Sequence, residues 1–258
     1  MRSPAEPDPD QRLFWRNAPN HRKPVMFQTW RQLLFLHWTV DPEMLSAQLP
    51  DGLHLDLFEG NAYLGVVPFY MRNIGPRGLT TFPGLSNFLE LNVRTYVYDD
   101  AGDPGVWFFS LDANNRIACA TARTLFKLPY YDAKMHSTEG DWVDYEALRF
   151  GRQDPAIYRY QKTGAARVAE AGTLDFFLVE RYLLFSHNPA SQKIMRGQVH
   201  HQPYQLHEAE VEAMSVAPVS WNGMDAPTCE PAHVCLAEDV NVQIFGLEVA
   251  GESRSRGS

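Results

Sequence analysis

Residues 88–98 read FLELNVRTYVY, and apolar and polar side chains alternate along this stretch with the period of a β-strand. One face of the predicted strand is an ordinary core face, made by Leu89, Leu91, Val93 and Val97. The other face carries Phe88, Glu90, Asn92, Arg94 and Tyr96. This second face decides where any chemistry would sit.

Alternate residues on one face of a strand lie about 6.6 Å apart, so Glu90, Asn92 and Arg94 face one small volume. A solvent-facing strand is one interpretation, and a semi-polar cavity is the other. After the turn over residues 99–105, the returning strand is expected to place Trp107, Phe109 and Leu111 on one side and Phe108, Ser110 and Asp112 on the other. Aromatic rings on both faces of this hairpin favour the cavity.

Further strands are predicted on both sides of this hairpin. They cover about residues 30–38, 53–71, 133–137, 142–150, 156–161, 193–201, 204–212 and 233–248. Short helices are expected after Asp41, over 114–126 and over 174–184, where Thr173 is the expected cap. Many strands with few helices predict an α+β fold, mainly antiparallel β, closed or nearly closed as a barrel.

The composition predicts one domain over residues 13–250, with disordered tails at 1–12 and 251–258, because 45% of the residues are apolar. A formal charge of -8 argues against nucleic acid as a partner. No apolar stretch is long enough for a membrane helix, and the N-terminus lacks the apolar core of a signal peptide. Three cysteines do not indicate a disulfide framework. We therefore expect a cytoplasmic protein. A homodimer is the assembly to test first, because it is the commonest among soluble proteins.

No metal site or cofactor is predicted. His200 and His201 are adjacent, so on a strand their side chains point to opposite faces. The spacing of Cys229, His233 and Cys235 lacks the paired CxxC of structural zinc sites. The sequence also contains no GxSxG elbow, P-loop, HExxH or GxGxxG after a strand, which removes the common hydrolase, nucleotide and metalloprotease chemistries.

Several motifs resemble the uncharacterised YqjF-like family, DUF2071. They are Trp30–Leu33–Leu34–Phe35–His37–Trp38, Leu49–Pro50–Gly52–Leu53, Val67–Pro68–Phe69, Glu90–Asn92–Arg94–Tyr96–Val97, Phe126–Leu128–Pro129–Tyr130 and Glu180–Arg181–Tyr182. That family is similar in fold to acetoacetate decarboxylase, and the match runs from about residue 14 to 248. The resemblance implies an acetoacetate decarboxylase-like β-barrel or cone with a few peripheral helices, enclosing a small-molecule pocket.

The resemblance to the decarboxylase also implies site residues. Glu90 falls where that enzyme has its pocket glutamate, and Arg31 lies near its substrate-side arginine. Tyr130 and Tyr131 stand in place of the reactive lysine and its lysine neighbour, and a phenol cannot form an imine. We therefore expect Glu90 and Tyr130 to be catalytic. The expected ligand-binding residues are Arg31, Asn92, Arg94, Arg123, Lys134 and Arg181.

Three functions remain open on this sequence. The first is a Schiff-base-independent lyase, hydratase or isomerase that acts on a carbonyl or carboxylate compound, with Glu90 as general acid or base. The second is a non-catalytic barrel that binds or senses such a ligand. The third is a scaffold whose pocket is filled by aromatic side chains. Imine chemistry at Lys134 would need a cation beside it to lower the pKa of its amine, and none follows it in the sequence.

Overall fold

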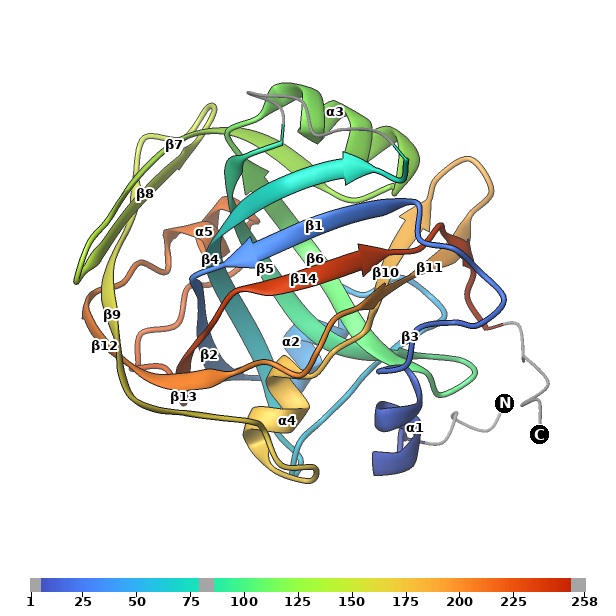
Figure 1. Ribbon diagram of the computed structural model, residues 1–258. Coiled ribbons are helices and arrows are strands. Elements are labelled where there is room, and N and C mark those ends of the chain that lie inside the picture. The colour runs from blue at the N-terminus through green and yellow to red at the C-terminus, as the bar shows by residue number, and fades with distance from the viewer. Residues whose placement is uncertain (1–5, 79–85, 252–258) are drawn as a thin grey trace.

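The computed structural model describes residues 6–78 and 86–251, and most of its regular structure is β-strand (Figure 1). The strands are β1 Met26–Arg31, β2 Leu33–Val40, β3 Leu53–Leu55, β4 Ala62–Pro76, β5 Phe88–Asp99, β6 Pro104–Ala113, β7 Tyr130–Glu139, β8 Val143–Arg149, β9 Ala156–Arg167, β10 Leu183–Asn188, β11 Lys193–His200, β12 Leu206–Ala213, β13 His233–Ala237, β14 Val240–Ile244 and β15 Glu248–Val249. The helices are α1 Pro9–Phe14, α2 Pro42–Ser46, α3 Arg116–Leu125, α4 Leu174–Val179 and α5 Ala217–Trp221.

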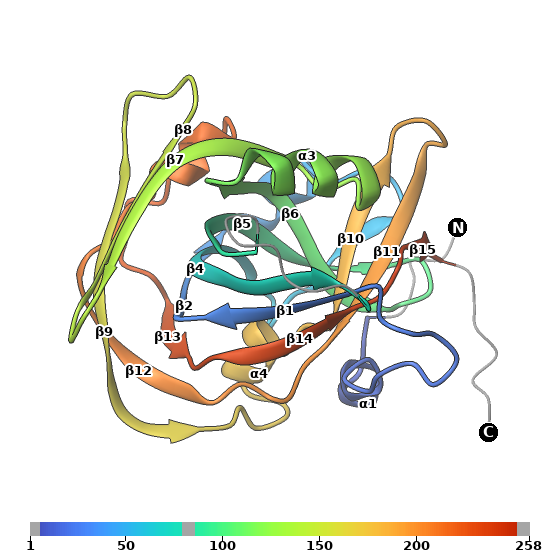
Figure 2. The same cartoon turned by 45° about the horizontal axis from the view of Figure 1, so that its top comes forward.

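The sheet curls into a ring of hydrogen-bonded strands (Figure 2). Following the pairings from β1 through β14, β11, β10, β6, β5 and β4 leads back to β1. A second circuit shares β4, β5 and β6 and runs through β7, β8, β9, β12, β13 and β2. The pairings are antiparallel except β10–β6 and β6–β7. The predicted mainly antiparallel α+β fold is confirmed.

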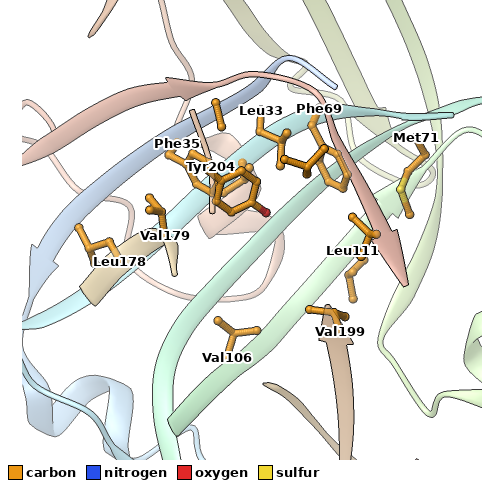
Figure 3. Packing of buried hydrophobic residues seen from close by; sticks show 14 of the residues in the cluster. Leu33, Phe35, Phe69, Met71, Val106, Leu111, Leu178, Val179, Val199 and Tyr204 are labelled. Atoms are coloured by element: carbon orange, nitrogen blue, oxygen red, sulfur yellow. The ribbon is translucent and has the colours of Figure 1, made fainter. Parts of the chain in front are cut away.

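β5 separates two hydrophobic clusters, one on each of its faces. Leu89, Leu91 and Val93 pack into a cluster with side chains of β4, β8 and β9, as the alternation predicts. Phe88 and Tyr96 pack on the opposite side, into a cluster inside the first circuit. Figure 3 shows this inner cluster, in which side chains from β2, β4, β6 and β11 converge. The polar face of residues 88–98 therefore looks inward.

The alternation expected along the returning strand β6 is wrong, because a β-bulge interrupts it. Val93 pairs with Ser110, but the next residue, Arg94, pairs with Phe108. Phe109 is thus an extra residue on β6, and such an insertion reverses which face the following side chains occupy. Phe108 packs with the inner cluster, whereas Phe109 packs on the other side of the sheet.

All three predicted helices form, but the third ends earlier than expected. Asp41 caps α2 and Asn115 caps α3, each through its side-chain oxygen. The helix expected over 174–184 ends at Val179, although Thr173 caps it as expected. The chain leaves the helix at Glu180, and β10 then pairs with β11 and β6. The residues after Val179 thus pair in the sheet although their apolar pattern is also compatible with a helix.

The N-terminal segment is ordered from an earlier position than we expected. Residues 9–14 form α1, and the side chain of Asp8 accepts a hydrogen bond from the backbone of Gln11. The Arg12 guanidinium lies 2.6 Å from the buried carboxylate of Asp56 and so ties the helix to the sheet. Residues 1–5 and 252–258 of the expected tails lie outside the described residues. Within residues 6–78 and 86–251, none of the helices has the length and apolar character needed to span a membrane.

Candidate functional site

The first circuit of strands encloses a cavity of about 270 Å³. Its wall is mostly apolar, with side chains from β1, β4, β5, β6, β11, β14 and α3. The predicted face of β5 contributes Phe88, Glu90, Asn92 and Arg94 to this wall, and Tyr130 joins them from the start of β7. These polar groups therefore meet in one enclosed volume. The structure thus brings these four side chains to one cavity, and their expected roles in catalysis and ligand binding stay predictions.

Glu90 and Tyr130 form a buried hydrogen-bonded pair. The Tyr130 hydroxyl donates to Oε2 of Glu90 over 2.8 Å, and only 2% of Glu90 is exposed. Burial is the main cause that raises the pKa of the Glu90 carboxyl to about 8; the Tyr130 hydrogen bond opposes this rise and nearby Asp112 adds to it. At neutral pH the group is a protonated acid. The pKa of Tyr130 is also raised, chiefly by burial, so the phenol stays neutral.

Asn92 and Arg94 carry polar atoms that the fold leaves unused. Oδ1 of Asn92 and Nε of Arg94 are buried and have no hydrogen-bond partner in the described structure. Buried polar atoms are normally paired, because an unpaired one costs about 1–3 kcal/mol. Both residues line the cavity. Oδ1 of Asn92 and Nε of Arg94 are therefore available to hydrogen-bond a ligand in the cavity.

The Arg94 guanidinium is held without a carboxylate. Its Nη2 donates to the carbonyl of Leu178 over 3.2 Å and to the hydroxyl of Tyr96 over 3.3 Å. The Phe35 ring lies 5.2 Å below it, a favourable cation–π distance. Among the residues that the structure describes, no acidic side chain forms an ion pair with Arg94. Because Glu90 is neutral at pH 7, the cavity carries a net positive charge.

Arg31 and Arg123 were expected to bind ligand, but both lie outside this cavity. Arg31 is at the end of β1 on the surface, where it pairs with Asp239 at 2.6 Å and with Glu139 at 3.3 Å. Arg123 is exposed on α3 and donates to the backbone carbonyl of Tyr130 over 3.0 Å. Arg31 therefore does not occupy the position near the pocket that the resemblance to the decarboxylase implies. Arg123 supports Tyr130 from outside.

Lys134 and Arg181 also lie away from the cavity. Lys134 is exposed on β7, at a point where this strand has left β6 and pairs with β8. Arg181 is buried, but it binds Asp56 at 2.6 Å and the carbonyl of Phe177. This arginine and its neighbour Glu180 are both at most 7% exposed. Within the described residues, no lysine lines the cavity.

Helix α3 covers one side of the cavity and borders its opening. Ile117, Ala118, Thr121 and Ala122 of this helix line the cavity, yet Ile117 is 60% exposed. An apolar side chain that touches both the cavity and solvent marks the entrance. In Figure 2 the helix lies across the ring of strands. The sequence showed a helix of small residues here but gave no sign that it would border a cavity.

Histidines that drew attention in the sequence have partners other than a metal. Nδ1 of His233 lies 2.9 Å from Nδ1 of His37, and its Nε2 lies 2.7 Å from the carboxylate of Asp175. Both ring nitrogens of His233 are therefore engaged in hydrogen bonds. Cys235 is fully buried and burial raises the pKa of its thiol, whereas Cys229 is exposed. Over the described parts of the chain, no group of three or more acidic, histidine or cysteine side chains is arranged to hold a metal ion.

The fold defines the class of this protein. Acetoacetate decarboxylase from Legionella pneumophila superposes with a TM-score of 0.62 at 15% identity, covering 97% of this chain and 98% of that one. The enduracididine biosynthesis enzyme MppR, in a complex with pyruvate, gives a TM-score of 0.60 at 11% identity, covering 90% and 93%. At these identities the likeness concerns the fold alone. The chain has an acetoacetate decarboxylase-like fold.

The chain belongs to the DUF2071 family. The model of this family, described as an uncharacterised conserved protein, matches residues 27–241. The uncharacterised protein YqjF of Bacillus subtilis (strain 168) is 39% identical over 219 residues, which cover 84% of this chain and 89% of that protein. The predicted membership is thereby confirmed.

Proposed function

We propose that the cavity binds a small carboxylate whose remaining part is apolar, and that Glu90 acts on it as general acid or base. The observation that carries this proposal is the presence of unpaired polar atoms of Asn92 and Arg94 beside neutral Glu90 in one apolar cavity. A guanidinium offers two parallel donors to a carboxylate. The unpaired Oδ1 of Asn92 can only accept a hydrogen bond, so it suits a hydroxyl group of the ligand.

The size and lining of the cavity support an apolar body on the ligand. A cavity of about 270 Å³ leaves space beyond the polar groups, and Phe69, Met71 and Leu111 line it. Carboxylate recognition at Arg94 would leave the rest of the molecule directed toward these side chains and α3. MppR, which shares the fold, has been solved with pyruvate bound. Aryl- or alkyl-substituted keto and hydroxy acids are therefore the first compounds to test.

Glu90 is suited to proton transfer near neutral pH. A general acid works best when its pKa is close to the working pH, and that of Glu90 is about 8. Tyr130 donates to one carboxyl oxygen, which leaves the acid proton on the other. A lyase, hydratase or isomerase that needs one acid or base and an oxyanion donor would be served by Glu90 with Arg94. Imine formation is not part of this proposal, because Lys134 is exposed.

A thermal-shift screen followed by calorimetry tests the proposal. We expect 3-phenylpropanoate and phenyl-substituted keto or hydroxy acids to stabilise the protein, and the matching carboxamides to do so much less. The variant Glu90→Gln should keep binding and lose any turnover. A borohydride-trapped ketone adduct that disappears in Lys134→Ala would contradict the absence of imine chemistry. Failure of every carboxylate to bind would contradict the proposed site.

A non-catalytic binding protein is the second candidate. The apolar side chains that dominate the cavity wall can bury the apolar part of a ligand without any catalytic group. Turnover separates the two functions. Turnover that is lost in Glu90→Gln would favour the enzyme, whereas a ligand that binds tightly and is unchanged after prolonged incubation with the wild type would favour the binding protein.

A further inference from the structure

A row of side chains crosses the sheet beside Arg94. In register, His233 of β13 lies opposite His37 of β2, His37 lies opposite Gly65 of β4, and Gly65 lies opposite Arg94 of β5. Residues directly opposite one another in a sheet project from the same face. A methyl group at Gly65 would lie 3.0 Å from the His37 ring and 3.4 Å from the Arg94 side chain. The glycine therefore provides the space in which these two side chains approach each other.

Tyr96 completes a continuous hydrogen-bonded path from this row to the cavity. Arg94 Nη2 donates to the Tyr96 hydroxyl over 3.3 Å, and that hydroxyl lies 2.6 Å from Nε2 of His37. Nδ1 of His37 is 2.9 Å from Nδ1 of His233. Nε2 of His233 is 2.7 Å from Asp175. The path thus links a cavity-lining cation to a partly exposed carboxylate.

Chemistry fixes the direction of each hydrogen bond in this path. A guanidinium can only donate, so the Tyr96 oxygen accepts from Arg94 and its hydrogen is free to go to Nε2 of His37. A neutral His37 then donates from Nδ1 to His233, which must accept there. Neutral His233 carries its hydrogen on Nε2, and Asp175 accepts it. This assignment pairs every polar hydrogen of the path and leaves both imidazoles neutral.

We propose that Tyr96, His37 and His233 form a relay that positions Arg94 and couples anion binding in the cavity to protonation of His233. The proposal rests on the proposed function, since it needs an anion at Arg94. The three residues act through Arg94 and are positioning residues. The relay ends where solvent can reach it, because 22% of the Asp175 side chain is exposed.

The groups around His233 allow a proton to be taken up there. Asp175 of α4 faces Nε2 of His233 and also pairs with Arg167 of β9 at 2.6 Å. His37 faces Nδ1 of His233, and burial lowers the pKa of His37 well below its usual value, with help from His233 and Arg94. On β13 itself, the neighbouring thiol of Cys235 is buried and neutral, since burial raises its pKa. Of these two imidazoles, that of His233 is the one whose ring nitrogen contacts a carboxylate.

A second proton on His233 would reverse the relay. Its Nδ1 would become a donor, so His37 would have to accept there and carry its own hydrogen on Nε2. That hydrogen would be donated to the Tyr96 oxygen, and the Tyr96 hydroxyl hydrogen would turn toward an anion held by Arg94. Acid should therefore strengthen anion binding. Because such coupling is reciprocal, anion binding should in turn cause His233 to take up a proton.

Calorimetry of 3-phenylpropanoate binding to the full-length protein tests this coupling. Heats measured at about pH 6 in two buffers of different ionisation enthalpy give the number of protons taken up, in the range where imidazoles titrate. We expect the wild type to take up at least about 0.3 proton per ligand and Tyr96→Phe to take up close to none. Glu90 remains protonated at this pH, free or bound, so it does not contribute.

The matched control is Tyr158→Phe, which makes the same change to a buried tyrosine in the other hydrophobic cluster. It should leave proton uptake unchanged. Binding without uptake in the wild type, or equal uptake in Tyr96→Phe, would overturn the relay and leave the proposed function intact. Absence of binding would overturn both. Should Tyr96→Phe fail to fold, nitrogen NMR of the wild type decides: hydrogens on Nδ1 of His37 and Nε2 of His233 support the relay, and any other tautomers overturn it.

Discussion

The carboxyl group of Glu90 shows what a single residue contributes to this molecule. Alternation along residues 88–98 was sufficient to predict that Glu90, Asn92 and Arg94 share a face, because strand geometry fixes it. The sequence also gave a reason for that face to be sheltered, namely its aromatic neighbours. It could not show that Tyr130 would donate to Glu90 over 2.8 Å, because these residues meet only through the β6–β7 pairing.

The same residue gives a prediction for stability. The folded protein keeps Glu90 protonated up to about pH 8, whereas in the unfolded chain this carboxyl has its ordinary pKa of 4.5. The folded state thus holds the extra proton between these values, and stability falls as pH rises through this interval. The loss at pH 7 is on the order of 3 kcal/mol.

Glu90→Gln should remove this loss. Urea denaturation at pH 5 and pH 8 should show the wild type losing stability between the two values by several kcal/mol more than the variant. Parallel pH profiles for the two proteins would mean that Glu90 is ionised in the folded state, contrary to our account.

Four residues that were expected in the site lie elsewhere. Arg31 and Arg123 were expected there from the resemblance to a distant fold relative, and local geometry selected neither Lys134 nor Arg181 for the site. The long side chain of Arg31 lies on the surface, where it pairs with Asp239. Of the expected site residues, Glu90, Asn92 and Arg94, whose orientation follows from the pleat of β5, line the cavity, and Tyr130 of β7 lines it with them.

At the scale of elements, β5 and α3 both contribute side chains to the cavity wall. The helix predicted over 114–126 formed over Arg116–Leu125. The bulge at Phe109 was not predictable, since nothing in the alternation of β6 marks an extra residue. Likewise, the apolar run after Thr173 satisfies a helix and a strand equally, and only pairing with β11 decides.

Closing the entrance at α3 should weaken binding of ligands with an apolar tail. Ala118→Trp places a large ring on the cavity side of the helix, and we expect at least tenfold weaker binding of 3-phenylpropanoate by calorimetry, because the ring occupies the space of the tail. Ala120→Trp, on the exposed side of the same helix, is the control and should bind normally. Equal affinity of the two variants would show that ligands do not pass or contact α3.

The whole molecule depends on closure of the first circuit of strands, from β1 through β14, β11, β10, β6, β5 and β4. The resemblance predicted a closed fold with a pocket, and the structure has such a ring. Local patterns could not give the closure itself, because it relies on pairings between distant segments, including the parallel contact of Leu184 with Val106. Those pairings depend on packing of the entire inner cluster.

Whether that ring encloses a carboxylate site is best tested by titrating 3-phenylpropanoate into Arg94→Met, with wild type and Arg123→Met as references. Methionine retains much of the arginine's apolar stem but none of its donors. Loss of charge-assisted hydrogen bonds worth about 1.5–3 kcal/mol should weaken binding to Arg94→Met by about 10- to 100-fold, while Arg123→Met stays within about twofold of wild type. Equal affinity of Arg94→Met and wild type would contradict the account.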